Sequence, residues 1–138
     1  MQILVVEDDA VLAMVSVLAL EEAGHTIAGL VHDTKSFQQL PTLNGTDLAL
    51  VDINLAGANE GLEVARALHE DQIPVLFISG QISAARENAH LALGLLRKPY
   101  ELEDLLDSVA YVHNTSSNTG STARRPSALE IFESNDNL

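Results

Sequence analysis

The stretch Ile3-Leu4-Val5-Val6-Glu7-Asp8-Asp9 decides the fold, because a short apolar run ends abruptly on three acids. Four consecutive apolar residues without polar alternation are typical of a strand that helices cover on both faces of a parallel sheet. Three similar runs follow along the chain, and polar residues come directly or shortly after each of them. These runs are Leu48-Ala49-Leu50-Val51 before Asp52, Val75-Leu76-Phe77-Ile78 before Ser79, and Leu93-Gly94-Leu95-Leu96 before Lys98-Pro99.

Helical segments separate these strands in the sequence. Their apolar residues recur at helical spacing, as Val64, Ala65 and Leu68 do. An additional apolar run at residues 27–31 predicts a fifth strand. We predict helices at residues 10–23, 34–40, 61–69, 82–89 and 102–112. Strands that alternate with helices predict an α/β domain with a doubly wound, five-stranded parallel sheet and helices on both faces.

Polar side chains gather at one edge of this predicted sheet. Ligands of doubly wound sheets bind outside the carboxyl ends of the strands, where Glu7, Asp8, Asp52, Ser79 and Lys98 all lie. Two carboxylates about 4 Å apart repel by roughly 4 kcal/mol at an effective dielectric near 20, so the acids require a cation. Mg²⁺ prefers hard oxygen ligands and commonly binds carboxylates together with a phosphate. The ammonium of a lysine and the hydroxyl of a serine suit the phosphate, so the sequence predicts a site for Mg²⁺ and a phosphoryl group.

The bulk composition is that of one globular domain. The chain has 138 residues, of which 46% are hydrophobic, and its net charge of −13 argues against nucleic-acid binding, since phosphate contacts need a basic surface. The sequence contains no Cys, which excludes disulfides and thiolate metal sites, and its five His residues show no paired ligand spacing. We also find no apolar stretch long enough for a bilayer and no secretory signal. We therefore expect a cytoplasmic protein with no membrane partner.

The composition changes after His113. We predict a domain at residues 1–113 and a flexible tail, rich in Ser and Asn, at residues 114–138. Within this tail, residues 127–133 have the apolar spacing of one helical turn, which is too short to be stable alone. The tail is too short for an output domain.

The quoted motifs, in this order and spacing, resemble the receiver domain of two-component response regulators. The resemblance runs from Ile3 to about Val112. Each motif is weak alone, but the whole set is specific. The resemblance implies a flavodoxin-like fold with strand order 2-1-3-4-5. It also implies a stand-alone receiver that takes part in a phosphorelay.

The resemblance assigns the phosphoryl chemistry to three residues. Asp52 would be the phosphoacceptor, Ser79 would sense the phosphoryl group and Lys98 would pair with it. The peptide bond between Lys98 and Pro99 is often cis in this family, so we predict a cis bond here. Receivers often carry a switching aromatic residue where this chain has Leu95.

The resemblance also implies a set of ligands for Mg²⁺. Asp8 and Asp52 would bind the metal directly, Glu7 would act mainly through a metal-bound water, and Asn54 would contribute its backbone carbonyl. We interpret Asp9 instead as the N-terminal cap of the first helix.

The first helix carries two apolar stripes. One stripe is predicted to face the sheet and comprises Leu12, Val15, Ser16, Ala19 and Leu20. The other is predicted to be partly exposed and comprises Val11, Met14 and Leu18. This second stripe is either covered by neighbouring loops or is a docking face for a histidine kinase, a histidine phosphotransfer protein or a second copy of the chain.

Three functions are compatible with the sequence. The leading hypothesis is a response-regulator receiver that accepts a phosphoryl group from a phosphohistidine partner onto Asp52, in a Mg²⁺-dependent reaction, and signals or relays by protein contact. Such a protein catalyses its own phosphorylation and dephosphorylation and is not otherwise an enzyme. The alternatives are a receiver-like adaptor that is not phosphorylated and a phosphotransferase or phosphatase with an Asp nucleophile. Those enzymes usually carry an Asp-x-Asp motif, which Asp8-Asp9-Ala10 does not supply.

Overall fold

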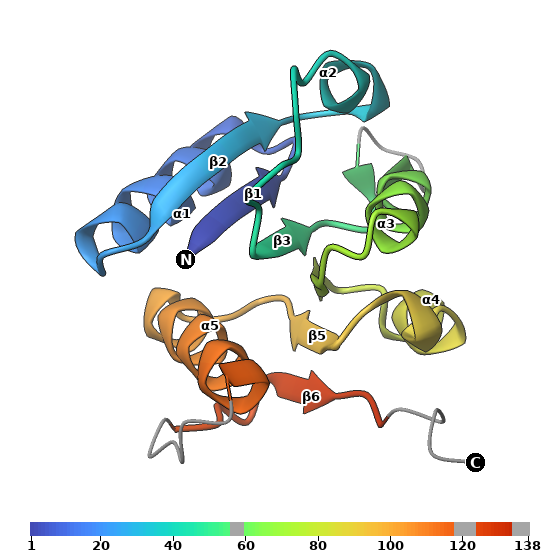
Figure 1. Ribbon diagram of the computed structural model, residues 1–138. Helices are drawn as coiled ribbons and strands as arrows, with labels where there is room; N and C mark the ends of the chain where they lie inside the picture. The colour runs from blue at the N-terminus through green and yellow to red at the C-terminus, as the bar shows by residue number, and fades with distance from the viewer. Residues whose placement is uncertain (56–59, 118–123, 134–138) are drawn as a thin grey trace.

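The computed structural model describes residues 1–55, 60–117 and 124–133, and Figure 1 shows how the elements follow one another. The strands are β1 (Gln2–Val6), β2 (Thr26–Val31), β3 (Leu48–Val51), β4 (Val75–Ser79), β5 (Gly94–Arg97) and β6 (Leu129–Ile131). The helices are α1 (Ala10–Glu22), α2 (Thr34–Gln38), α3 (Glu60–Glu70), α4 (Ile82–Glu87), the 3-10 turn η2 (Ala89–Leu91) and α5 (Leu102–Ser117).

The strands form one sheet in the order β2-β1-β3-β4-β5-β6. The pairs among β1 to β5 are all parallel, which confirms the predicted doubly wound, flavodoxin-like sheet with order 2-1-3-4-5. The sheet has one strand more than predicted, because β6 pairs antiparallel with β5. Residues 127–133 therefore form no helical turn, although their apolar spacing would allow one. The reason is that the edge of β5 offers unpaired backbone groups, which a local apolar spacing does not reveal.

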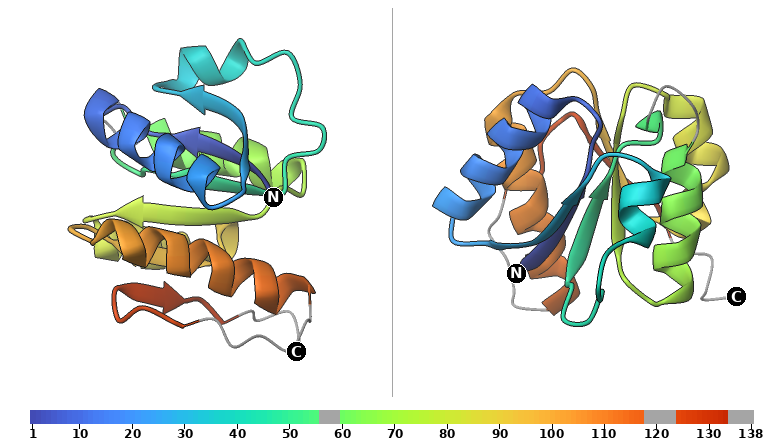
Figure 2. Two further views of the ribbon diagram at one scale, coloured as in Figure 1. Left: turned by 90° about the vertical axis from the view of Figure 1, so that its left-hand side faces the viewer. Right: turned by 90° about the horizontal axis from the view of Figure 1, so that it is seen from above.

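Helices cover both faces of the sheet, as Figure 2 shows. Helices α1 and α5 lie on one face, and α2, α3 and α4 lie on the other. Successive strand residues point to opposite faces, so β1 contributes Ile3 and Val5 to one buried cluster and Leu4 and Val6 to the other. This double burial is why the strands read as continuous apolar runs.

The last helix is longer than predicted and crosses the predicted domain boundary. Helix α5 continues to Ser117, although the sequence suggested an end near residue 112. Of the predicted tail, residues 118–123 and 134–138 lie outside the described residues. Residues 124–133 lie against the domain, where Leu129 is buried.

The first helix buries Ala13, Ser16 and Leu20 against the sheet. The second apolar stripe is exposed as predicted, with Val11 at 74% and Met14 at 51% exposure. Val15 was predicted to face inward and is instead 41% exposed. The helix is rotated so that its inner face centres on Ala13, which the apolar pattern could not specify because the helix is apolar on most sides.

No helix in the described parts of the chain has both the length and the apolar character needed to span a bilayer.

The structure predicts that Gly61, near the start of α3, accepts no side chain. A Cβ atom at this position would fall on the backbone oxygen of Asp52 and would lie 2.7 Å from the Cα of Ile53. We expect Gly61→Ala to lower the free energy of unfolding by about 1–3 kcal/mol, because backbone atoms would have to move. The control is Gly80→Ala, whose Cβ atom would lie no closer than 3.9 Å to any atom beyond its chain neighbours, the nearest being the backbone oxygen of Lys98. Urea denaturation of both variants tests this, and equal stabilities would contradict it.

Candidate functional site

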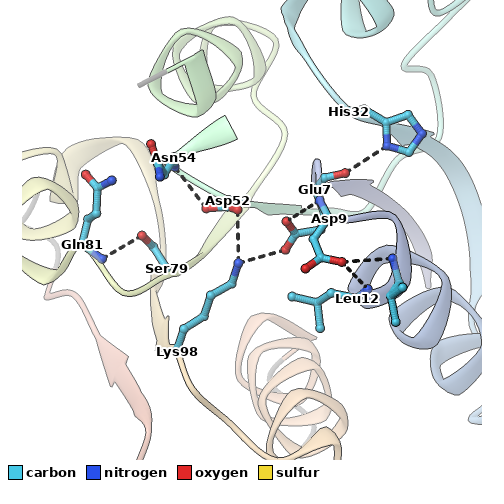
Figure 3. Close-up of polar contacts among 10 residues, drawn as sticks. Glu7, Asp9, Leu12, His32, Asp52, Asn54, Ser79, Gln81 and Lys98 are labelled. Atoms are coloured by element: carbon cyan, nitrogen blue, oxygen red, sulfur yellow. Dashed lines mark hydrogen bonds and ion pairs between the residues drawn. The ribbon is translucent and has the colours of Figure 1, made fainter. Parts of the chain in front are cut away.

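The candidate site lies at the carboxyl edge of the sheet. Glu7 follows β1, Asp52 follows β3, Ser79 ends β4 and Lys98 follows β5. Figure 3 shows the side chains of Glu7, Asp52 and Lys98 converging at this edge, with Ser79 beside them. The strand ends that the sequence placed together are therefore together in the structure.

The Lys98 ammonium bridges two buried carboxylates. Its Nζ donates to Oε1 of Glu7 at 3.0 Å and to Oδ2 of Asp52 at 3.1 Å. Each carboxylate side chain has 7% of its surface exposed, while that of Lys98 has 27% exposed. The peptide bond from Lys98 to Pro99 is cis, as predicted.

Backbone amides hold the remaining oxygen of each carboxylate. Oε2 of Glu7 accepts from the amide of Asp9 at 3.2 Å, and Oδ1 of Asp52 accepts from the amide of Asn54 at 3.0 Å. The Asp9 side chain turns the other way and accepts from the amides of Val11 and Leu12, both at 3.0 Å. Asp9 is therefore the cap of α1, as predicted.

Three carboxylates meet closely enough to share a cation. Glu7, Asp8 and Asp52 each offer a ligand oxygen, and these oxygens lie within 4.8 Å of one another. Hard, negatively charged oxygens at this spacing suit Mg²⁺, so the donor set fits the metal that the sequence predicts. Asn54 lies beside this cluster, and its described contact is the amide that holds Asp52.

Ser79 connects the site to the two neighbouring elements. The residue is 1% exposed, and its Oγ accepts from the amide of Gln81 at 2.9 Å, directly before α4. Its backbone oxygen accepts from the amide of Lys98 at 3.0 Å. Ser79 thus joins the end of β4 to the start of α4 and to the residue that follows β5.

The pKa values of Glu7 and Lys98 are both raised, for different reasons. Burial raises the pKa of the Glu7 carboxyl to about 7, against the opposing hydrogen bond from Lys98. Burial acts to lower the pKa of Lys98, but its hydrogen bond to Glu7 and the charge of Asp52 outweigh this and raise it. The lysine is therefore held as an ammonium.

Two further residues support the site and were not predicted. The Gln81 amide holds Ser79, as described above. The Nδ1 atom of His32 lies 3.0 Å from the backbone oxygen of Glu7. His32 directly follows β2, and this position at the carboxyl end of a strand could have placed it near the site. The sequence offered no signal for Gln81, because a backbone amide acts there.

Comparison with known proteins assigns most of the chain to one family. A family model described as the response regulator receiver domain matches residues 3–110. The chain is 33% identical over 109 residues to the uncharacterized transcriptional regulatory protein YkoG of Bacillus subtilis (strain 168), covering 75% of this chain and 47% of that protein. The chain spans about half the length of the curated relatives it matches.

Solved structures share the same fold. The signal receiver domain of a modulated diguanylate cyclase from Desulfovibrio desulfuricans G20 is 28% identical, with a TM-score of 0.69 over 85% of this chain and 97% of that chain. The non-phosphorylated HemR receiver domain from Leptospira biflexa is 24% identical, with a TM-score of 0.73 over 91% of this chain and 97% of that chain.

The raised pKa of Glu7 predicts a pH dependence of stability. Because the folded chain holds this proton more tightly than the unfolded chain, the stabilisation is complete below about pH 4.5 and is lost as the pH rises through about 7. Glu7→Gln stays neutral and lacks this loss. We expect the free energy of unfolding of the variant, relative to the unmodified chain, to rise by roughly 2 kcal/mol from about pH 5 to about pH 8. Urea denaturation in metal-free buffer measures it, and a pH-independent difference would contradict it.

Proposed function

The chain belongs to the response regulator receiver domain family, and on that basis we propose that Asp52 accepts a phosphoryl group from a phosphohistidine partner. One observation carries the proposal. Asp52 lies in a cluster of three carboxylates and contacts the ammonium of Lys98 at 3.1 Å. A nucleophile, a site for a divalent cation and a fixed positive charge are thereby adjacent.

The reaction requires little covalent chemistry from the protein. A carboxylate oxygen of Asp52 attacks phosphorus and forms an O–P bond, while the P–N bond to the donor histidine breaks. The electron pair of that bond stays on the imidazole nitrogen, which takes up a proton. Catalysis of such a transfer depends on positioning and on electrostatic stabilisation.

The residues around Asp52 supply this positioning and charge. The Asn54 amide fixes one carboxylate oxygen and so sets the direction of attack. The Lys98 ammonium exchanges its contact with Asp52 for one with the transferred phosphoryl oxygens, as a point charge suits phosphate. The Ser79 hydroxyl donates a hydrogen bond to another of these oxygens.

A divalent cation would complete the site. Asp8, Asp52 and the backbone carbonyl of Asn54 would hold Mg²⁺, with Glu7 acting mainly through a metal-bound water. When bound, Mg²⁺ supplies positive charge that offsets the negative charge of the phosphoryl group. The hydrogen bond from Lys98 keeps Glu7 next to this position in the metal-free chain.

The alternatives have less support. A receiver-like adaptor that is never phosphorylated does not need an acceptor, three acids and a lysine in contact. A phosphotransferase or phosphatase with an Asp nucleophile needs a second acid two residues further on, and that position carries Asn54.

The partner surface that we propose is the exposed stripe of α1. Val11, Met14 and Leu18 are 74%, 51% and 58% exposed, and Val15 extends the patch. The helix begins directly after Asp8 and Asp9, so a protein docked on the stripe has its reactive histidine close to Asp52. The proposed donors are a histidine kinase or a histidine phosphotransfer protein. We further propose that the phosphorylated chain signals or relays by protein contact.

Phosphorylation by a small-molecule donor tests the acceptor. Incubation with acetyl phosphate and Mg²⁺ is expected to add the mass of one phosphoryl group, measured on the intact protein. Asp52→Asn is expected to abolish this gain, because an amide is a poor nucleophile. The control is Asp9→Asn, which changes a neighbouring acid while keeping a good helix cap, and it should be modified normally. A gain of mass in Asp52→Asn, or none in the unmodified chain, would contradict the proposal.

A charge on the α1 stripe tests the docking surface. We expect Met14→Glu to slow phosphotransfer from a phosphorylated histidine kinase about tenfold or more, since a buried apolar contact would receive a charge. Phosphorylation by acetyl phosphate should stay unchanged. The matched control is Gln38→Glu, which adds the same charge to exposed α2 on the opposite face of the sheet. Normal transfer to Met14→Glu would rule out this surface, and loss of both reactions would indicate misfolding.

A further inference from the structure

The C-terminal segment of residues 124–133, here called the strap, contacts three elements at one side of the domain. Its strand β6 pairs with β5, a glutamate on it binds α4 and an arginine on it binds α5. Figure 1 shows β6 next to β5, with α4 and α5 on either side. The strap therefore occupies a sheet edge that would otherwise be open.

The backbone of the strap continues the sheet. Leu95 pairs with Glu130, and the pairing extends one residue to each side. The amide of Arg97 donates to the oxygen of Ala128 at 3.0 Å, and the amide of Phe132 donates to the oxygen of Leu93 at 2.9 Å. The strand is only three residues long, so few hydrogen bonds hold it.

The sequence of β5 is adapted to this neighbour. A Cβ atom at Gly94 would fall on the backbone oxygen of Glu130 and would lie 3.3 Å from the Cα of Ile131. A glycine inside a strand often marks a close approach of another backbone. The strap could not lie in this position beside a larger residue, so β5 and β6 fit one another.

Side chains fasten the strap on both faces of the sheet. Leu129 is 3% exposed and belongs to the cluster under α1 and α5, while Phe132 packs against the cluster on the other face. Arg86 of α4 donates from Nε and Nη2 to the two carboxylate oxygens of Glu130, at 2.9 and 2.7 Å.

Two further ion pairs join the strap to α5. Arg124 donates to Asp107 at 2.9 Å and to Asp104 at 3.1 Å. The side chains of Arg86 and Arg124 are more than half exposed, and exposed ion pairs contribute little to stability. A three-residue ladder, three exposed ion pairs and one buried side chain, Leu129, make a contact small enough to open without unfolding the domain.

Two short paths, each made of hydrogen bonds and a few residues of chain, link the strap to the phosphoacceptor site. Ser79 accepts from the amide of Gln81, which caps the same six-residue helix that carries Arg86. Lys98, in contact with Asp52, directly follows Arg97, whose amide is bound to the strap. The site and the strap thus share α4 on one side and the end of β5 on the other.

We propose that the strap is a regulatory contact whose hold on β5 weakens when Asp52 is phosphorylated; this inference rests on the proposed function. When Ser79 donates its hydroxyl hydrogen to a phosphoryl group, its Oγ moves toward that group, and the Gln81 amide that donates to this Oγ, and with it the start of α4, moves too. When Lys98 turns toward the same group, the end of β5 shifts. Both changes act on elements that hold the strap. Helix α4 carries Arg86, which binds Glu130, and the end of β5 carries Arg97, whose amide donates to Ala128.

Hydrogen exchange on the full chain tests the proposal. We expect the amides of Arg97 and Phe132, which donate across the interface between β5 and β6, to exchange about tenfold faster after phosphorylation with acetyl phosphate and Mg²⁺. The amide of Ala49, which donates to the oxygen of Pro74 at 2.9 Å, at the other end of β3 from the site, is the internal control and should not change. The mass of the intact protein is recorded on the same samples.

Charge reversal tests the reciprocal effect. Because the strap and the site are coupled, loosening the strap should raise the phosphorylated fraction. Arg86→Glu and Glu130→Arg are each expected to speed exchange of the strap and to raise the phosphorylated fraction at a subsaturating donor concentration. The double variant restores the ion pair with its two charges exchanged. Both the exchange rate of the strap and the phosphorylated fraction should then return toward those of the unmodified chain.

The outcomes separate this inference from the proposed function. A mass gain with unchanged or slower exchange of the strap would overturn the inference and leave phosphorylation intact. Single variants that loosen the strap without changing the phosphorylated fraction would also overturn it. If no mass is gained at all, the proposed function fails and control by phosphorylation fails with it.

Discussion

The site depends on one constraint, which is that the Lys98 ammonium holds two buried carboxylates together. Glu7 and Asp52 have 7% of their side chains exposed and would repel one another without a cation. The lysine lies between them at 3.0 and 3.1 Å. This contact is available only while the carboxylates lack a stronger positive partner. Under the proposed function, a phosphoryl group on Asp52 would compete for the same ammonium, so phosphorylation would change the contact that holds the two carboxylates.

The sheet makes this constraint possible. Its central strands are buried on both faces by apolar side chains, and the polar groups of the site gather at their carboxyl ends. Residues 7, 52, 79 and 98 are far apart in sequence, and parallel pairing brings them to one edge. The same edge lies at the starts of α1 and α4. A partner docked on α1 and a change felt by α4 can therefore act through a single group of side chains.

Most of this arrangement could be predicted from the sequence because its signals are local. Apolar runs identified the five parallel strands, and the rule for their carboxyl ends identified Glu7, Asp52 and Lys98 as neighbours. The strand β6 could not be predicted, since Leu129 and Ile131 have an apolar spacing that also suits a helical turn. Its conformation depends on pairing with β5, more than thirty residues earlier. The exposure of Val15 depends on the rotation of α1, and the raised pKa of Glu7 depends on burial, neither of which is encoded in local spacing.

A double-mutant cycle between Asp52→Asn and Lys98→Gln tests the central claim most directly. The free energies of unfolding of the unmodified chain, the two single variants and the double variant are measured by urea denaturation in metal-free buffer. If the ammonium and the carboxylate form one electrostatic unit, their coupling energy should be roughly 1–3 kcal/mol, because contacting charged residues are not additive. Additive effects of the two substitutions would show that Lys98 does not hold Asp52 and would contradict the account.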